Sequence, residues 1–82
     1  MTLPRAYEDQ LVERAKTDPE AFGELYDHYF AQMYRFVYSR MREQDAAEDV
    51  TSDVFFKAMR AIGRYKPTGR PFSSWLYQIS VN

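Results

Sequence analysis

The sequence predicts an all-α protein, a compact bundle of three to four helices. Its long segments repeat apolar residues at helical spacing, and no segment alternates apolar and polar residues as a half-buried strand does. Glycine is scarce, with three residues in 82, and there is no internal repeat. A chain of this length allows one small domain with one core.

The first helix is predicted over Pro4–Lys16 and the second over Pro19–Met41. The first places an apolar stripe at i, i+4 and i+8, formed by Tyr7, Leu11 and Ala15. Asp18 can cap the second helix, and Pro19 suits its first position, where no N–H is needed. Six turns of the second helix carry an apolar face, formed by Phe22, Leu25, Tyr26, Tyr29, Met33, Phe36, Val37 and Met41.

Asp45 and Glu48 resemble a capping box and predict the start of a third helix, which Gly63 would terminate as a C-terminal cap. Its predicted inward stripe consists of Ala47, Val50, Val54, Ala58 and Ile62. The following segment, Arg64–Pro71, contains two prolines, a glycine and three basic residues, which is typical of a loop.

A fourth helix is predicted from about Pro71–Ser73 onward. Its apolar residues are Phe72, Trp75, Leu76 and Ile79. No stop signal precedes Asn82, so we expect the chain to be part of a longer protein.

Composition excludes several classes of protein. Without cysteine there is no disulfide framework and no thiolate metal cage. The apolar runs are too short to cross a bilayer, and the first ten residues lack the apolar core of a signal peptide. We therefore expect a cytoplasmic protein without membrane insertion.

The sequence offers little catalytic chemistry. His28 is the only histidine, and Ser73, Ser74 and Ser80 have no partner base nearby in the sequence. Glu48, Asp49 and Asp53 could hold a hard cation, but solvated acids on a helix are far commoner. No Walker loop, GxGxxG, HExxH or EF-hand signature is present. We expect no enzyme activity, no metal site and no cofactor.

The net charge of −1 conceals a division along the chain. Residues 1–53 hold all twelve acids and six bases, whereas residues 54–82 hold five bases and no acid. The near-zero net charge argues against a nonspecific polycation but allows a polarised binder.

The third helix carries an acidic face that includes one large aromatic residue. This face consists of Asp45, Glu48, Asp49, Ser52, Asp53 and Phe56, on the side away from Val50 and Val54. A large aromatic residue among carboxylates is typical of a protein-binding face. The alternative is that Phe55 and Phe56 both enter the core and the acids merely solvate the helix.

The acid-free end of the chain interleaves bases with aromatic residues, an arrangement that suits single-stranded nucleic acid. The set comprises Lys57, Arg60, Arg64, Tyr65, Lys66, Arg70, Phe72, Trp75, Tyr77, Gln78 and Asn82. Gln78 and Asn82 lie at i, i+4 and could present their amides to base edges. Alternatively, Trp75 and Ile79 belong to the core, and the bases are solvated or face a protein partner.

The segment EDVTSDVFFKAMRAIGRYKPTGRPFSSWLYQISVN, residues 48–82, resembles the second conserved region of bacterial sigma factors, especially the extracytoplasmic-function group. Matches to its first motif are Ala47, Glu48, Asp49, Val50, Thr51, Asp53, Val54, Phe55 and Lys57. Matches to its last motif are Phe72, Trp75, Leu76, Ile79, Ser80 and Asn82. The segment Asp18–Tyr29 resembles the usual opening of that region, so the likeness extends over about residues 10–82.

This resemblance implies two binding surfaces and no bond chemistry. The third helix would dock on the clamp helices of the largest catalytic subunit of RNA polymerase through Asp49, Ser52, Asp53 and Phe56; the family usually has Gln where Ser52 stands. The loop 63–71 would capture a flipped base of the −10 promoter element on the non-template strand. The candidate DNA-binding residues are Arg64, Tyr65, Lys66, Arg70, Ser73, Tyr77, Gln78 and Asn82.

The resemblance also implies partners and a missing domain. A −35-binding domain is expected after residue 82, and an anti-sigma factor is an expected partner. The competing hypothesis is a helical protein-interaction module whose main partner is another protein, such as that anti-sigma factor. A duplex-binding helix-turn-helix protein is disfavoured because the bases concentrate in a loop rather than along one recognition helix.

Overall fold

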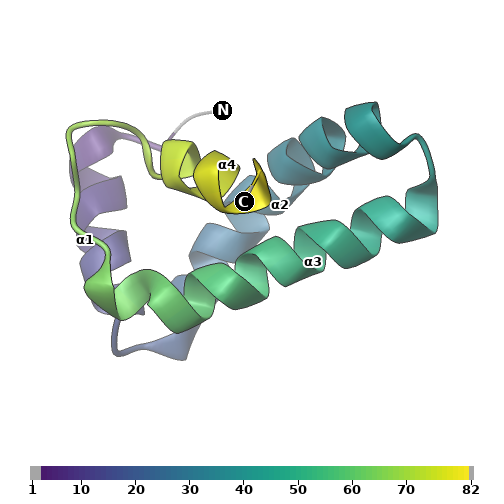
Figure 1. Ribbon diagram of the computed structural model, residues 1–82. Coiled ribbons are helices and arrows are strands. Elements are labelled where there is room, and N and C mark those ends of the chain that lie inside the picture. Colours follow the sequence, from purple (N-terminus) through teal and green to yellow (C-terminus); the bar gives the residue numbers. More distant parts are fainter. Residues whose placement is uncertain (1–2, 82) are drawn as a thin grey trace.

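The computed structural model describes residues 3–81, and these residues confirm the predicted all-α fold. They form four helices and one 3₁₀ turn, α1 (Arg5–Ala15), α2 (Pro19–Met41), α3 (Gln44–Ala61), η1 (Ile62–Arg64) and α4 (Phe72–Val81). No strand occurs within this part of the chain. In Figure 1, α2 and α3 form a long hairpin, α1 stands at one end of it, and α4 packs against both arms.

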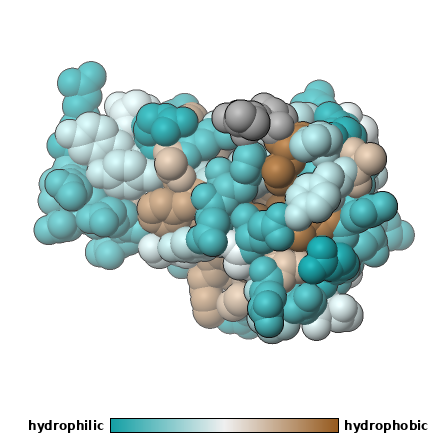
Figure 2. Space-filling model, turned by 180° about the vertical axis from the view of Figure 1, so that it is seen from behind, coloured by the Kyte–Doolittle hydropathy of each residue, from teal (hydrophilic) through white to brown (hydrophobic). Residues whose placement is uncertain are grey.

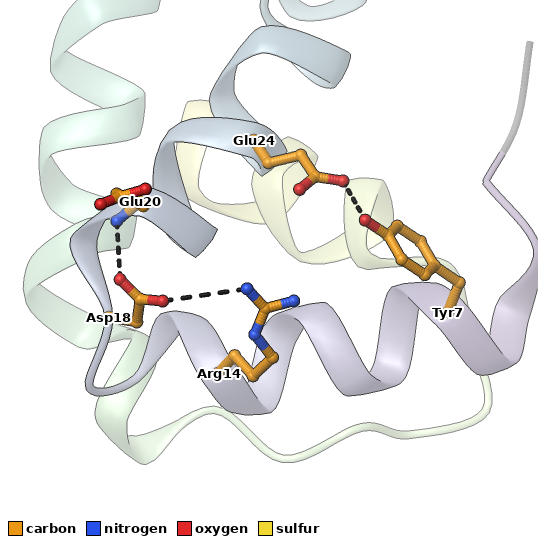
Figure 3. A network of polar contacts seen from close by, with 5 residues as sticks. All are labelled: Tyr7, Arg14, Asp18, Glu20 and Glu24. Atoms are coloured by element: carbon orange, nitrogen blue, oxygen red, sulfur yellow. Dashed lines mark hydrogen bonds and ion pairs between the residues drawn. The ribbon is translucent and has the colours of Figure 1, made fainter.

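The junction of α1 and α2 follows the prediction closely. The Asp18 carboxylate caps α2 by accepting a hydrogen bond of 3.0 Å from the Glu20 amide. The same carboxylate lies 3.8 Å from the Arg14 guanidinium, and the Tyr7 hydroxyl donates to Glu24 on α2 (Figure 3). A cap and two polar contacts therefore fix the angle at which α1 meets α2.

Two predicted helix boundaries are wrong. α3 begins at Gln44 because the Glu43 side chain reaches the Ala46 amide and caps the helix, so Asp45 and Glu48 form no capping box. Gly63 lies inside the 3₁₀ turn and is no left-handed cap; among residues 3–81 the glycine with positive φ is Gly69. The helix ends by tightening into i→i+3 hydrogen bonds, which need no glycine.

The core lies where all four helices meet, and its fully buried large side chains include Leu11, Leu25, Met33, Phe72 and Leu76. Most of the residues predicted to form the apolar stripes are buried. The exceptions are Tyr7, Tyr26 and Met41, which are exposed, and Phe36, Val50, Trp75 and Ile79, which are half-buried.

Val50 was predicted to face the core from α3, but it is half-buried and the neighbouring Thr51 is buried instead. Its hydroxyl donates to the Ala47 carbonyl at 2.7 Å, so the buried polar group is satisfied. The face shown in Figure 2 is mainly hydrophilic, with hydrophobic side chains in small separate areas.

Candidate protein-binding and nucleic-acid interfaces

The four residues predicted to bind polymerase, Asp49, Ser52, Asp53 and Phe56, are all exposed on α3. Phe56 has half of its surface exposed, at 51%, whereas the adjacent Phe55 is 2% exposed. The alternative that both rings enter the core is therefore wrong. Phe55 takes the buried position because it packs edge-on against Tyr26 of α2, with ring centroids 4.9 Å apart.

The sequence did not indicate the apolar residues that flank Phe56. Met59 and Tyr26 are also exposed, at 50% and 36%. Together they border a shallow cavity of about 310 Å³ between α2 and α3, lined by Pro19, Phe22, Gly23, Tyr26, Ser52, Phe55, Phe56 and Met59. The spacing of Ser52, Phe56 and Met59 along one helix face was the signal that could have identified it.

A second cavity, of about 260 Å³, lies between the loop after η1 and the outer side of α4. Its lining contains three basic residues and no acid, and consists of Arg64, Tyr65, Lys66, Thr68, Arg70, Pro71, Ser74, Trp75 and Gln78. Five of the predicted DNA-binding residues thus lie together, namely Arg64, Tyr65, Lys66, Arg70 and Gln78. The arrangement can hold an anionic ligand that carries a flat ring.

The remaining predicted DNA-binding residues do not join this cavity. Ser73 is half-buried and does not line it. Tyr77 faces α2, where its hydroxyl accepts a 3.0 Å hydrogen bond from Gln32 and its ring meets Phe36 edge-on. Asn82 lies outside the described residues.

Aromatic rings form one wall of the loop cavity. Tyr65 and Trp75 lie with centroids 4.6 Å apart and planes tilted by 36°, and both rings rest on the buried Phe72. Burial, followed by the charges of Glu8 and Asp9, raises the pKa of Tyr65, so its phenol is neutral at physiological pH. Trp75 combines packing on the core with a place in the cavity wall.

The loop is held in place from α1. Glu8 is 2% exposed, and its carboxylate accepts hydrogen bonds from the Tyr29 hydroxyl and from the Phe72 amide, the latter at 3.0 Å. The Phe72 amide opens α4, so a residue 64 positions away in the chain caps this helix. On the same side, the Arg5 guanidinium donates to the carbonyl of Gly69.

Burial, together with the hydrogen bond to Glu8, raises the pKa of Tyr29 above the usual range of a phenol. The neutral hydroxyl is therefore a stable donor. No buried side-chain nitrogen or oxygen within residues 3–81 lacks a hydrogen-bond partner. The buried carboxylate of Glu8 thus accepts hydrogen bonds from two donors on two other helices.

The described part of the chain contains no group of three or more His, Asp or Glu side chains that could hold a metal ion. His28 is half-buried, with its ring edge-on to Tyr29 at 4.7 Å, as expected for an ordinary helix residue. None of the helices between residues 3 and 81 is both long enough and apolar enough to span a membrane.

Comparison with known proteins gives a consistent result. Residues 25–82 match the family described as Sigma-70 region 2. The chain is 45% identical over 74 residues to the ECF RNA polymerase sigma factor BldN of Streptomyces coelicolor, an alignment covering 89% of this chain and 28% of that protein. It is 33% identical over 67 residues to the ECF RNA polymerase sigma factor SigW of Bacillus subtilis, covering 82% of this chain and 35% of that protein.

A third relative, the RNA polymerase sigma-H factor of Pseudomonas aeruginosa, is 32% identical over 81 residues, covering 98% of this chain and 42% of that protein. The chain therefore spans less than half the length of each of these relatives. No solved structure matches. The chain belongs to the sigma-70 region 2 family, as a region 2 domain similar to those of ECF sigma factors.

Proposed function

We propose that this domain binds RNA polymerase through the outer face of α3 and stabilises promoter opening by holding unstacked non-template bases of the −10 element in the loop cavity. The observation that carries the proposal is the lining of that cavity, where three cations surround a tilted pair of aromatic rings and no acid is present. Cations along a groove attract phosphates, and rings stack with unpaired bases at about 1–3 kcal/mol per base.

The energetics of such a site are balanced. Extruding a base from duplex DNA costs a few kcal/mol, and stacking and phosphate contacts must offset that cost. The hydrogen bond that Arg5 donates to Gly69 and the one that Glu8 accepts from Phe72 order the loop before the strand arrives, so less conformational entropy is lost on binding. We expect Gln78, at the edge of the cavity, to contact a base with its side-chain amide.

The first experiment measures binding of single-stranded oligonucleotides to the chain by fluorescence anisotropy. A pool with a randomised central segment, enriched over several rounds, supplies the preferred sequence. Trp75 is the only tryptophan, so its emission reports insertion of a base beside it. We expect sequence preference and an affinity that falls steeply with salt.

Lys66→Ala is the test variant for this experiment, and Lys16→Ala is its control because Lys16 pairs with Glu13 on α1, at 2.8 Å. Each lost phosphate contact should lower the slope of log affinity against log salt by about 0.7 for a single strand. Equal slopes for the two variants, or binding without sequence preference, would contradict the proposed role of the loop cavity.

The polymerase-binding half of the proposal has its own test. Phe56→Ala and Asp49→Ala should each weaken binding to core polymerase, and for Phe56 we expect about tenfold or more, as for a central aromatic contact. Tyr38→Ala and Asp27→Ala are matched controls, since both side chains are exposed on α2. If the α3 and α2 variants bound polymerase equally well, the docking face would be misassigned.

A protein-interaction role is the second candidate, and the shallow cavity beside Phe56 and Met59 favours it. An anti-sigma factor would fit this role by covering the same face of α3. If the chain bound an anti-sigma factor but showed no preference among single-stranded sequences, the interaction module would be the better description.

A further inference from the structure

The second half of α2 is a positively charged segment that the proposed interfaces do not use. Residues 28–42 contain three arginines, Arg35, Arg40 and Arg42, and no Asp or Glu. Residues 54–82, which run from the second part of α3 through the loop cavity and α4, are the other long stretch without acids. Eleven residues, 43–53, separate the two stretches in the sequence, so their positions in the fold decide whether their charges act together.

Tyr77 joins the two acid-free segments. From α4 it reaches α2, where its hydroxyl accepts from Gln32 at 3.0 Å and its ring meets Phe36 edge-on at 4.9 Å. The guanidinium of Arg40 lies over the same Phe36 ring, 4.7 Å from its centroid. A continuous line of contacts therefore leads from Arg40 through Phe36 to Tyr77, the residue next to Gln78 in the cavity lining.

Arg35 and Arg40 are exposed, and no carboxylate compensates either charge. The ion pairs within residues 3–81 involve Arg14, Lys16 and Lys57 only. The contact with Phe36 fixes the Arg40 guanidinium without neutralising it, because a ring face attracts a cation while carrying no net charge. These two arginines are thus available to an anionic partner.

We infer that Arg35 and Arg40 bind phosphates of the double-stranded DNA next to the strand segment held in the loop cavity. The inference rests on the proposed function, since the cavity sets where the opened strand lies. The line of contacts from the cavity to the Arg40 guanidinium crosses α4 and then the Phe36 ring, so it spans up to roughly 20 Å, from one helix diameter of about 10 Å and two ring contacts of about 5 Å each. Duplex DNA rises about 3.4 Å per base pair, so the contacts should fall within about the first six base pairs of the duplex.

The test compares two oligonucleotides that share one single-stranded segment, the preferred sequence from the selection described above. One is the single strand, and the other is a fork carrying an additional eight base pairs of duplex. The unaltered chain should bind the fork more tightly and with a steeper salt dependence. Arg40→Gln and Arg35→Gln should each lower the salt slope on the fork by about 0.9 and leave it unchanged on the single strand.

Arg60→Gln is the matched control. Arg60 lies over the ring of Phe56, 5.7 Å from its centroid, so it repeats the arginine–phenylalanine contact on α3. Its substitution removes the same charge and the same kind of contact, and it should not change the preference for the fork. Shortening the duplex of the fork from eight to two base pairs should abolish the effect of Arg40→Gln.

Four outcomes would overturn the inference. The first is equal affinity of the unaltered chain for the fork and the single strand, and the second is an equal loss of affinity for both substrates in the Arg40 and Arg35 variants. The third is a loss of affinity for the fork in Arg60→Gln as large as in those variants. The fourth is a loss of polymerase binding with no loss of DNA binding. If Arg40→Gln unfolds the chain, Arg35→Gln decides. If the unaltered chain fails to bind the single strand, that result counts against the proposed function instead. The affinities of the unaltered chain and of Arg35→Gln for duplex DNA alone then test the arginines separately.

Discussion

Replacing Glu8 with alanine tests whether a buried carboxylate holds α4 and the loop in place. The substitution removes the acceptor of two hydrogen bonds, one from the Tyr29 hydroxyl and one from the Phe72 amide. Tyr29 and Phe72 are 3% and 1% exposed, so water cannot easily replace the lost partner. Both donors would remain buried and unsatisfied.

The expected magnitude follows from these two contacts. An unsatisfied buried donor costs about 1–3 kcal/mol, which gives a loss of about 2–6 kcal/mol for Glu8→Ala. A domain of this length has a free energy of unfolding of about 4–12 kcal/mol, so the loss is a large fraction of the total. Glu8→Gln should cost only about 1–2 kcal/mol, because its carbonyl can accept from Phe72 while its amide donates to the Tyr29 oxygen.

Urea unfolding followed by far-ultraviolet circular dichroism measures these differences, and Trp75 emission follows the α4 region separately. Tyr29→Phe combined with Glu8→Ala should cost less than the sum of the single substitutions, since both remove the same hydrogen bond. The reasoning is refuted if Glu8→Ala costs less than about 1 kcal/mol, or if Glu8→Gln costs as much as Glu8→Ala.

Three other predictions concern Tyr29, the cap of α2 and the loop backbone. The raised pKa of Tyr29 favours its protonated form in the folded state. The stability that this contributes is complete below about pH 10 and is lost as the pH rises further. Unfolding midpoints between about pH 9 and 11 should therefore fall less steeply for Tyr29→Phe than for the unaltered chain. Asp18→Ala removes the acceptor for the Glu20 amide and should cost about 0.5–2 kcal/mol in urea unfolding, whereas an unchanged midpoint would mean that the cap contributes nothing. Gly69 has a φ of +85°, so Gly69→Ala should cost about 1–2 kcal/mol, and thermal unfolding without such a loss would show that the loop can change its backbone conformation.

Apolar spacing and one cap made most of the fold predictable. The periodicity of α2 gave its bounds, Pro19–Met41, and Asp18 marked its start. Helical spacing placed Phe56 on the outer face of α3 but left open whether both phenylalanines enter the core, because neighbouring positions on a helix differ by only about 100°. Packing against Tyr26 decided it.

The support of the loop could not be predicted. Glu8 looks like a solvated acid in a charged first helix, and its partners lie 21 and 64 positions away in the chain. Tyr77 was assigned to DNA because it belongs to the acid-free, aromatic end of the chain, but it contacts α2. The polymerase-binding and DNA-binding roles of the named residues, and the −35-binding domain expected after residue 82, stay predictions.

The distribution of charge along the chain also has a consequence within each long helix. α2 has Glu20 in its first turn and Arg40 in its last, and α3 has Asp45 and Arg60 in the corresponding places. Each charge opposes the partial charge of the helix end where it lies, which stabilises a helix by about 0.3–1 kcal/mol per residue at low salt. Some of the charges proposed to attract polymerase and DNA therefore also stabilise a helix end, and others lie next to charges that do. Neutralising a whole cluster would weaken binding and helix together, and only single substitutions with stability measured alongside can separate the two effects.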